Sequence, residues 1–312
     1  MRWKRPSRSY VQDRRGGGGF GGFGGGGGMG GGGIPIPMGR GGFGGMGLLL
    51  VIAVIGFQMC TSGGLPDVGG GGGGGGLGGG IGGLSAPQND GDYGVPEGDD
   101  RAEFVDAVTS DVQEMWQDTF AASNREYRNA PLQLYSRNVN SACGSASSAV
   151  GPFYCPLDET IYLDMTFFDE LATRFGAPGD FGGAYVIAHE FGHHVQTVLG
   201  ISEQVRAEQQ RNPNAANDLS VLQELQADCF AGLWAHHVFT DPDNENVTDI
   251  TDEDIREGLD AAAAVGDDRI QQQSGRGVNP ETWTHGSSEQ RMQWFQEGFR
   301  SGTTDACDTF SG

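Results

Sequence analysis

Beyond residue 100, apolar residues recur every three or four positions, which is the period of an amphipathic helix. This spacing, with its capping residues and terminal glycines, predicts helices over 101–123, 166–175, 183–199, 218–239, 252–265 and 287–299. Runs rich in β-branched and aromatic residues predict strands over 132–139 and 160–164. The pattern therefore predicts a helix-rich α+β domain with a small sheet.

The chain before residue 99 lacks this periodicity. Glycine dominates from residue 16 to 47, and residues 61–98 are Gly-rich and then Pro- and Asp-rich, so both stretches are predicted to be disordered. Residues 48–60 form an apolar run, which reaches bilayer-spanning length when the uncharged residues before it are included. The predicted division is a basic, Gly-rich, disordered tail (1–40), a transmembrane anchor (41–60), a disordered Gly-rich linker (61–98) and a folded domain (99–312).

The charges flanking the apolar run predict its orientation. Seven basic residues and one acidic residue lie within residues 1–60, and no basic residue follows until Arg101. Positive charge favours the cytoplasmic side, so we expect a single-pass protein of the cell membrane. Its N-terminus would be cytoplasmic and its folded domain periplasmic or extracellular. A cleaved signal peptide is the alternative, although its basic region would be over 40 residues long.

The part of the chain after residue 60 is strongly acidic, with 12 basic and 40 acidic residues. Such a surface cannot neutralise phosphate groups, which excludes nucleic acid as a partner. Solubility is the ordinary reason for an acidic surface, while adaptation to salt or the binding of cationic substrates stays open.

Four of the five cysteines lie in the predicted domain, at positions 143, 155, 229 and 307. None of them forms a C-x-x-C pair, which argues against a cysteine zinc site. An even number of cysteines in a domain expected outside the cytoplasm favours two disulfides over buried free thiols.

The predicted helix over 183–199 carries the pattern H-E-x-x-H, formed by His189, Glu190 and His193. At about 100° per residue, the two histidines lie roughly 40° apart and one turn apart, so both imidazoles can reach one metal ion. Glu190 lies beside them, where it can take a proton from an activated water molecule. For this motif alone, an ordinary buried helix with hydrogen-bonded histidines is the alternative.

A catalytic zinc ion usually has three protein ligands and one water. Glu224 and Asp228 lie one turn apart on the predicted helix over 218–239. We expect Glu224 to be the third ligand and Asp228 to accept a hydrogen bond from a ligand imidazole. The reverse assignment, with Asp228 as the ligand, stays open. Leu199 stands where a metzincin would need its third histidine, which excludes that class.

A donor to the oxyanion of a tetrahedral intermediate is also needed, and His285 is the candidate. A surface histidine is the alternative reading of that residue, and Tyr154 and Tyr162 are weaker candidates for the role. Arg291 is expected in a structural salt bridge rather than as a clamp for a substrate carboxylate. The remaining histidines are expected to be structural: His194, His236 and His237.

Several motifs together resemble the bacterial putative neutral zinc metallopeptidase family over almost the whole chain. They include Asp-Arg-Arg at 13–15, Cys-Gly-Ser-Ala-Ser-Ser-Ala at 143–149, Gly-Pro-Phe-Tyr-Cys-Pro at 151–156, His-Glu-Phe-Gly-His-His-Val-Gln at 189–196 and Glu-Leu-Gln-Ala-Asp-Cys at 224–229. The resemblance implies a zincin-like fold of the gluzincin type, in which glutamate supplies the third ligand. It also implies an anchored, non-cytoplasmic enzyme with disulfides Cys143–Cys155 and Cys229–Cys307.

These features predict a membrane-anchored zinc peptidase that binds one Zn²⁺ and a peptide or protein substrate, with Glu190 as the general base. The substrate is expected to add a strand to the sheet edge near Thr160–Asp164. One alternative is an inactive binding or scaffold module in which zinc only joins two helices. Another is a zinc hydrolase of non-peptide amide bonds.

Overall fold

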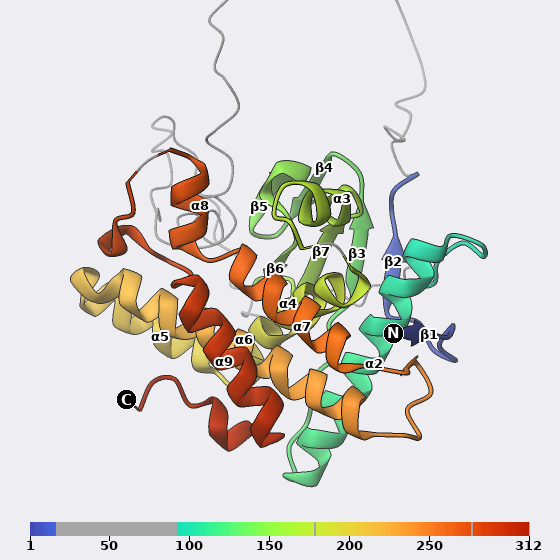
Figure 1. Ribbon diagram of the computed structural model, residues 1–312. Coiled ribbons are helices and arrows are strands. Elements are labelled where there is room, and N and C mark those ends of the chain that lie inside the picture. The colour runs from blue at the N-terminus through green and yellow to red at the C-terminus, as the bar shows by residue number, and fades with distance from the viewer. Residues whose placement is uncertain (17–92, 178, 276, 312) are drawn as a thin grey trace, which may run out of the picture.

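The computed structural model describes residues 1–16, 93–177, 179–275 and 277–311 (Figure 1). Its helices are α2 (Asp100–Ala122), α3 (Thr166–Thr173), α4 (Asp180–Val198), α5 (Ile201–Arg211), α6 (Ala216–Thr240), α7 (Asp252–Ala264), α8 (Asp267–Gln273) and α9 (Ser288–Ser301). The six predicted helices and the helix-rich α+β class are confirmed. The apolar pattern missed α5, which begins directly after Gly200 turns the chain with φ 77°, and the short helix α8.

The main sheet has four strands in the order β2 (Val11–Asp13), β3 (Leu132–Tyr135), β7 (Thr160–Asp164) and β6 (Phe153–Cys155). The first three are parallel, and β6 returns antiparallel to β7. Because β7 is paired on both sides, the expectation that a substrate pairs near Thr160–Asp164 is wrong. The edge of the sheet on that side is β6.

Two smaller strand pairs flank this sheet. β4 (Asn138–Ser141) pairs with β5 (Gly144–Ser147), and β1 (Arg2–Trp3) pairs with β8 (Val247–Thr248). The single strand predicted over 132–139 is therefore divided between β3 and β4, because the chain turns at Arg137, whose φ is 69°.

Close helix packing holds the core together. α4 packs against α6 and α7, and α6 packs against α9. At Gly192 of α4, an added Cβ would lie 2.9 Å from the Ala227 Cα of α6, which is closer than real side chains approach a backbone. A Cβ at Gly298 of α9 would overlap the Cys229 carbonyl oxygen. Glycine at these two positions therefore allows the helix backbones to touch.

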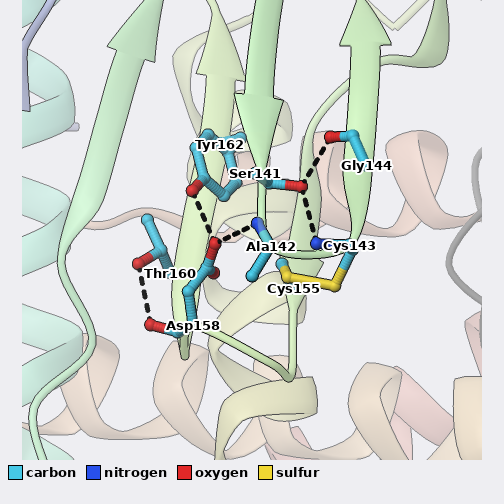
Figure 2. The surroundings of a disulfide bond; sticks show 8 residues. All are labelled: Ser141, Ala142, Cys143, Gly144, Cys155, Asp158, Thr160 and Tyr162. Atoms are coloured by element: carbon cyan, nitrogen blue, oxygen red, sulfur yellow. Dashed lines mark hydrogen bonds between the residues drawn. A yellow bond between two sulfur atoms is a disulfide. The ribbon is translucent and has the colours of Figure 1, made fainter. Parts of the chain in front are cut away.

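The disulfides Cys143–Cys155 and Cys229–Cys307 are both formed. The first joins the turn between β4 and β5 to the end of β6, as Figure 2 shows. Asp158 supports this corner, because its carboxylate accepts hydrogen bonds from the Ala142 N–H (2.7 Å) and the Tyr162 hydroxyl (2.9 Å). Cys229–Cys307 ties α6 to the C-terminal segment. The pairing implied by the resemblance is confirmed.

The N-terminal residues differ most from expectation. The prediction of a disordered tail over 1–40 is wrong for residues 1–16, which contribute β1 and β2 to the folded domain. Val11 is fully buried beside β3. The folded part also begins before residue 99, since Gly94 pairs with Gln12. A strand of three residues is too short to show periodicity, and its partners lie more than 80 residues away in sequence.

The predicted anchor (41–60) and most of the predicted linker (61–98) lie outside the described residues. Among the residues that the structure describes, no helix combines the length and the apolar character needed to span a membrane.

The buried strand β2 predicts a stability effect at Val11. In Val11→Asp, a charge without a partner would enter the core, and we expect a loss of roughly 3–5 kcal/mol in the free energy of unfolding. Ser7→Asp is the control, because Ser7 is exposed and should change stability by no more than about 0.5 kcal/mol. Urea denaturation of the full chain measures both, and equal stability of the two variants would contradict the packing of β2.

Candidate metal centre

The helices α4 and α6 bring His189, His193 and Glu224 together. One ligand atom from each residue lies within 4.8 Å of the others. The Glu224 carboxylate lies between the two rings, with one oxygen 3.2 Å from His189 Nε2 and the other 3.4 Å from His193 Nε2. His189 and Glu224 are buried, while His193 is partly exposed.

The donor set fits a zinc ion. Zinc with bonds of about 2.0–2.1 Å in a tetrahedral arrangement separates neighbouring ligand atoms by about 3.3 Å. The two imidazole nitrogens lie 3.2 and 3.4 Å from the Glu224 carboxylate, each from a different oxygen, which is close to that value. Two neutral imidazoles and one carboxylate are also the ligands of a known class of catalytic zinc site, which leaves a fourth position for water or substrate.

Asp228 lies behind His189 and fixes the orientation of its ring. Its carboxylate accepts from His189 Nδ1 (2.9 Å), from the Tyr185 hydroxyl (2.5 Å) and from Arg291 Nε and Nη2 (2.8 and 2.9 Å). Because Asp228 accepts the hydrogen bond from Nδ1 of His189, the opposite ring nitrogen, Nε2, faces His193 and Glu224. The alternative in which Asp228 is itself the third ligand is therefore not supported, because it contacts the opposite nitrogen.

Arg291 forms the buried salt bridge that was expected of it. Burial opposes the charge on Asp228, but Arg291 and His189 hold the pKa of that carboxyl below its usual range. Burial alone would lower the pKa of His189, whereas Asp228 raises it to about 9. The guanidinium group thus keeps a carboxylate ionised next to the candidate metal ligands.

Gln196 fixes the orientation of the His193 ring, as Asp228 fixes that of His189. Gln196 was not predicted from the sequence. Its side-chain carbonyl accepts from His193 Nδ1 at 3.0 Å. Its amide donates to the Gln223 carbonyl (2.7 Å) and to Gln226 Oε1 (3.1 Å), both on α6. The spacing of three residues from His193 on one helix face was the available signal. Both candidate ligand rings are therefore held through Nδ1 with Nε2 free.

The pKa values of the two glutamates at the site, Glu190 and Glu224, are shifted in opposite directions. Burial raises the pKa of Glu190, and the two nearby imidazoles only partly offset this. For Glu224 burial acts in the same direction, but His193 and His189 lower its pKa far below the usual range. Glu224 thus remains ionised, as a ligand must, whereas Glu190 is suited to hold a proton.

Glu190 also faces the edge of the sheet. The Tyr154 backbone N–H of β6 lies near enough to lower the pKa of this carboxyl group, which only partly offsets the effect of burial. The Tyr154 hydroxyl points elsewhere and lies 3.1 Å from His194 Nδ1. Since His194 Nε2 donates to the Arg128 carbonyl, Nδ1 accepts from Tyr154. His194 is therefore structural, as expected, and the tyrosine hydroxyl is occupied outside the metal centre.

His285 is buried rather than on the surface. It lines a cavity that the three candidate ligands also line. Its Nδ1 lies 3.1 Å from Asp267 Oδ1, and Asp267 Oδ2 accepts from the backbone N–H groups of Thr284, His285 and Gly286. Burial opposes protonation of His285, but the carboxylate of Asp267 raises its pKa. The ring is held through Nδ1, so Nε2 is the free nitrogen. No motif or spacing pointed to Asp267, which lies 18 residues before His285 in the chain.

The other candidates lie away from the site. The Tyr162 hydroxyl donates to Asp158 beside the Cys143–Cys155 disulfide (Figure 2), so the weaker suggestion of an oxyanion role for Tyr162 is wrong. His236 donates to the Phe299 carbonyl on α9. Burial lowers the pKa of His237, which fits its expected structural role.

A cavity of about 240 Å³ opens beside the three candidate ligands. Glu190, His285 and Arg291 also line it, together with residues of β6. One part of its wall is apolar and is made by Phe167, Phe175, Val186, Val265 and Ile270. Another part is polar and is made by Thr197, Ser202, Arg206, Gln209, Ser220 and Gln223.

Comparison with known proteins gives one family. The family described as "Putative neutral zinc metallopeptidase" matches residues 1–310. An Escherichia coli K12 protein named "Uncharacterized protein YpfJ" is 39% identical over 313 residues, which cover 99% of each chain. A Mycobacterium tuberculosis H37Rv protein named "Uncharacterized protein Rv2575" is 45% identical over 212 residues, 66% of this chain and 70% of the other. No solved structure matches the chain.

The contact between Gln196 and His193 predicts an effect on metal affinity. In Gln196→Leu, the His193 ring loses the acceptor at Nδ1, and we expect zinc affinity to fall about 10–100-fold. The control is Gln113→Leu on α2, which removes a buried hydrogen bond to the Ala130 carbonyl away from the metal centre. Competition titration with a zinc chelator measures both. The same affinity in the two variants would show that Gln196 has no part in the site.

Proposed function

The chain belongs to the putative neutral zinc metallopeptidase family, and from this premise we propose that it is a zinc-dependent peptidase with a zincin-like fold of the gluzincin type. His189, His193 and Glu224 would hold the metal, and Glu190 would be the general base. The observation that carries the proposal is the convergence of two imidazole nitrogens and one carboxylate, with separations that suit zinc, next to a buried carboxyl group that is not needed as a ligand.

Zinc bound there would supply the Lewis acid that polarises the scissile carbonyl and makes water acidic enough to react near neutral pH. The side chains supply the proton transfers. Glu190 takes a proton from the attacking water and passes it to the leaving amine. The buried position of Glu190, which raises its pKa, favours a group that must hold this proton between the two steps.

His285 is suited to stabilise the negative charge that develops on the carbonyl oxygen. Asp267 holds Nδ1 of the ring, so the opposite nitrogen can donate to the oxyanion from the cavity wall. Asp267 is in this scheme a positioning residue, since it acts through His285. Its carboxylate is itself fixed by three backbone N–H groups, which leaves the ring little freedom to turn.

The proposed substrate is a peptide or protein whose backbone runs along β6. Among the residues that the structure describes, this strand is the edge of the sheet on the side of the cavity, and its residues line the cavity together with Glu190. An extended peptide added to this edge would pass beside the catalytic carboxyl group. The disulfide Cys143–Cys155 at the end of β6 would hold the edge in place (Figure 2).

The base assignment is tested with Glu190→Gln. The amide cannot accept the proton, so we expect hydrolysis to fall by about 10²–10⁴-fold while zinc stays bound. The substrate is the peptide that wild type cleaves fastest in a library, and zinc content is measured on the same samples. Cleavage at the wild-type rate would contradict the role of Glu190.

The same screen separates the alternatives. A scaffold module would bind zinc and cleave nothing. A hydrolase of other amide bonds would cleave non-peptide amides but no peptide, and the Glu190→Gln change would abolish that activity too.

The role of His285 is tested with His285→Gln. Loss of one oxyanion donor typically costs about 10²–10³-fold in kcat, and we expect little change in KM because the interaction forms in the transition state. His236→Gln is the control, since that histidine also makes a hydrogen bond, a partly buried one to the Phe299 carbonyl, but lies outside the cavity. A kcat for His285→Gln within about twofold of the control would remove His285 from the mechanism.

A further inference from the structure

The sixteen N-terminal residues belong to the same folded unit as the metal centre. On one side of β2, the Leu132 N–H donates to the Tyr10 carbonyl (3.0 Å) and the Arg14 N–H donates to the Leu134 carbonyl (2.9 Å). On the other side, the Gly94 N–H donates to the Val11 carbonyl at 2.8 Å. The strand is therefore hydrogen-bonded on both sides to chain that lies beyond residue 92.

Side chains add further contacts between these residues and α2. The ring of Trp3 packs edge-on against Phe104, with 5.1 Å between centroids. The Ser9 hydroxyl donates to Asp106 at 2.5 Å, and the Ser110 hydroxyl donates to the Arg8 carbonyl at 3.0 Å. Together with the fully buried Val11, these contacts make the segment an internal part of the domain.

Three of the arginines in this segment, Arg2, Arg5 and Arg15, have acidic partners in the domain. Arg2 lies 2.5 Å from Asp249 next to β8, and Arg15 lies 2.8 Å from Asp99 at the start of α2. Arg5 donates to the Val95 carbonyl at 2.7 Å. Part of the basic composition that indicated a cytoplasmic tail is thus explained by ion pairs with an acidic domain.

We propose that residues 1–16 and the domain from residue 93 onward lie on the same side of the cell membrane, and that this side is outside the cytoplasm. Backbone hydrogen bonds join atoms about 3 Å apart, whereas the hydrocarbon core of a bilayer is about 30 Å thick. The two parts therefore cannot pair across it. The single crossing expected from the flanking charges is therefore incompatible with this pairing.

The disulfides decide which side this is. Cys143–Cys155 and Cys229–Cys307 are both formed, and disulfides of this kind persist in oxidising compartments. The domain is therefore outside the cytoplasm, and β2 brings the N-terminal segment with it. This conclusion does not depend on the proposed peptidase activity.

The test compares two variants of the full chain that each add one free cysteine, Ser7→Cys and Ser123→Cys, in a Cys60→Ser background that keeps the four disulfide cysteines. Ser7 and Ser123 are exposed, and neither lines the cavity. Because β2 and β6 are opposite edges of the sheet, a change at Ser7 also leaves the proposed substrate edge intact. Spheroplasts are treated with a membrane-impermeant maleimide before and after lysis, and a cytoplasmic thiol protein reports leakage. Zinc content of the purified variants confirms that they are folded.

We expect both cysteines to be labelled to the same extent in intact spheroplasts, with no increase on lysis. Labelling of Ser123→Cys alone before lysis would place the N-terminus in the cytoplasm and overturn the proposal. Labelling of both variants only after lysis would place the domain in the cytoplasm and overturn it as well.

Discussion

The close contact between α4 and α6 is the constraint on which the metal centre depends. Gly192 has no Cβ, so the α4 backbone lies against Ala227 of α6 at a separation that no other residue permits. The two candidate ligand histidines lie on either side of Gly192 in sequence, and Glu224 lies one turn before Ala227. Bonds to zinc are only about 2.0–2.2 Å long, so a wider gap would take the carboxylate out of reach of a shared ion.

Buried charge around this contact is arranged in pairs. Asp228 would be costly in the core alone, but Arg291, His189 and Tyr185 satisfy both of its oxygens. Such a network adds little stability over an apolar core, and its value lies in fixing a ring to one orientation. Gln196 and Asp267 fix imidazole rings in the same way, Gln196 through its amide oxygen and Asp267 through its carboxylate. Three imidazoles are thereby held through Nδ1, which leaves every Nε2 available to the cavity.

Local periodicity explains which parts could be predicted from the sequence. The candidate ligands and Asp228 were found because a spacing of four residues on a helix places side chains on one face, and zinc restricts the residue types. Gln196, which contacts His193, was not found. Asp267 was missed because its contact with His285 depends on tertiary structure. The segment 1–16 was misassigned because β2 is short and its neighbours are distant. Its arginines also match the charge pattern of a cytoplasmic flank, although some of them pair with acids such as Asp99.

The most direct test of the account is the position of the metal. A crystal structure of the zinc-loaded protein, with anomalous data collected at the zinc absorption edge, locates the ion without reference to activity. We expect one peak about 2.0–2.2 Å from His189 Nε2, His193 Nε2 and a Glu224 carboxylate oxygen. A peak at another site, or Glu224 directed away from an ion bound to the two histidines, would contradict the central claim.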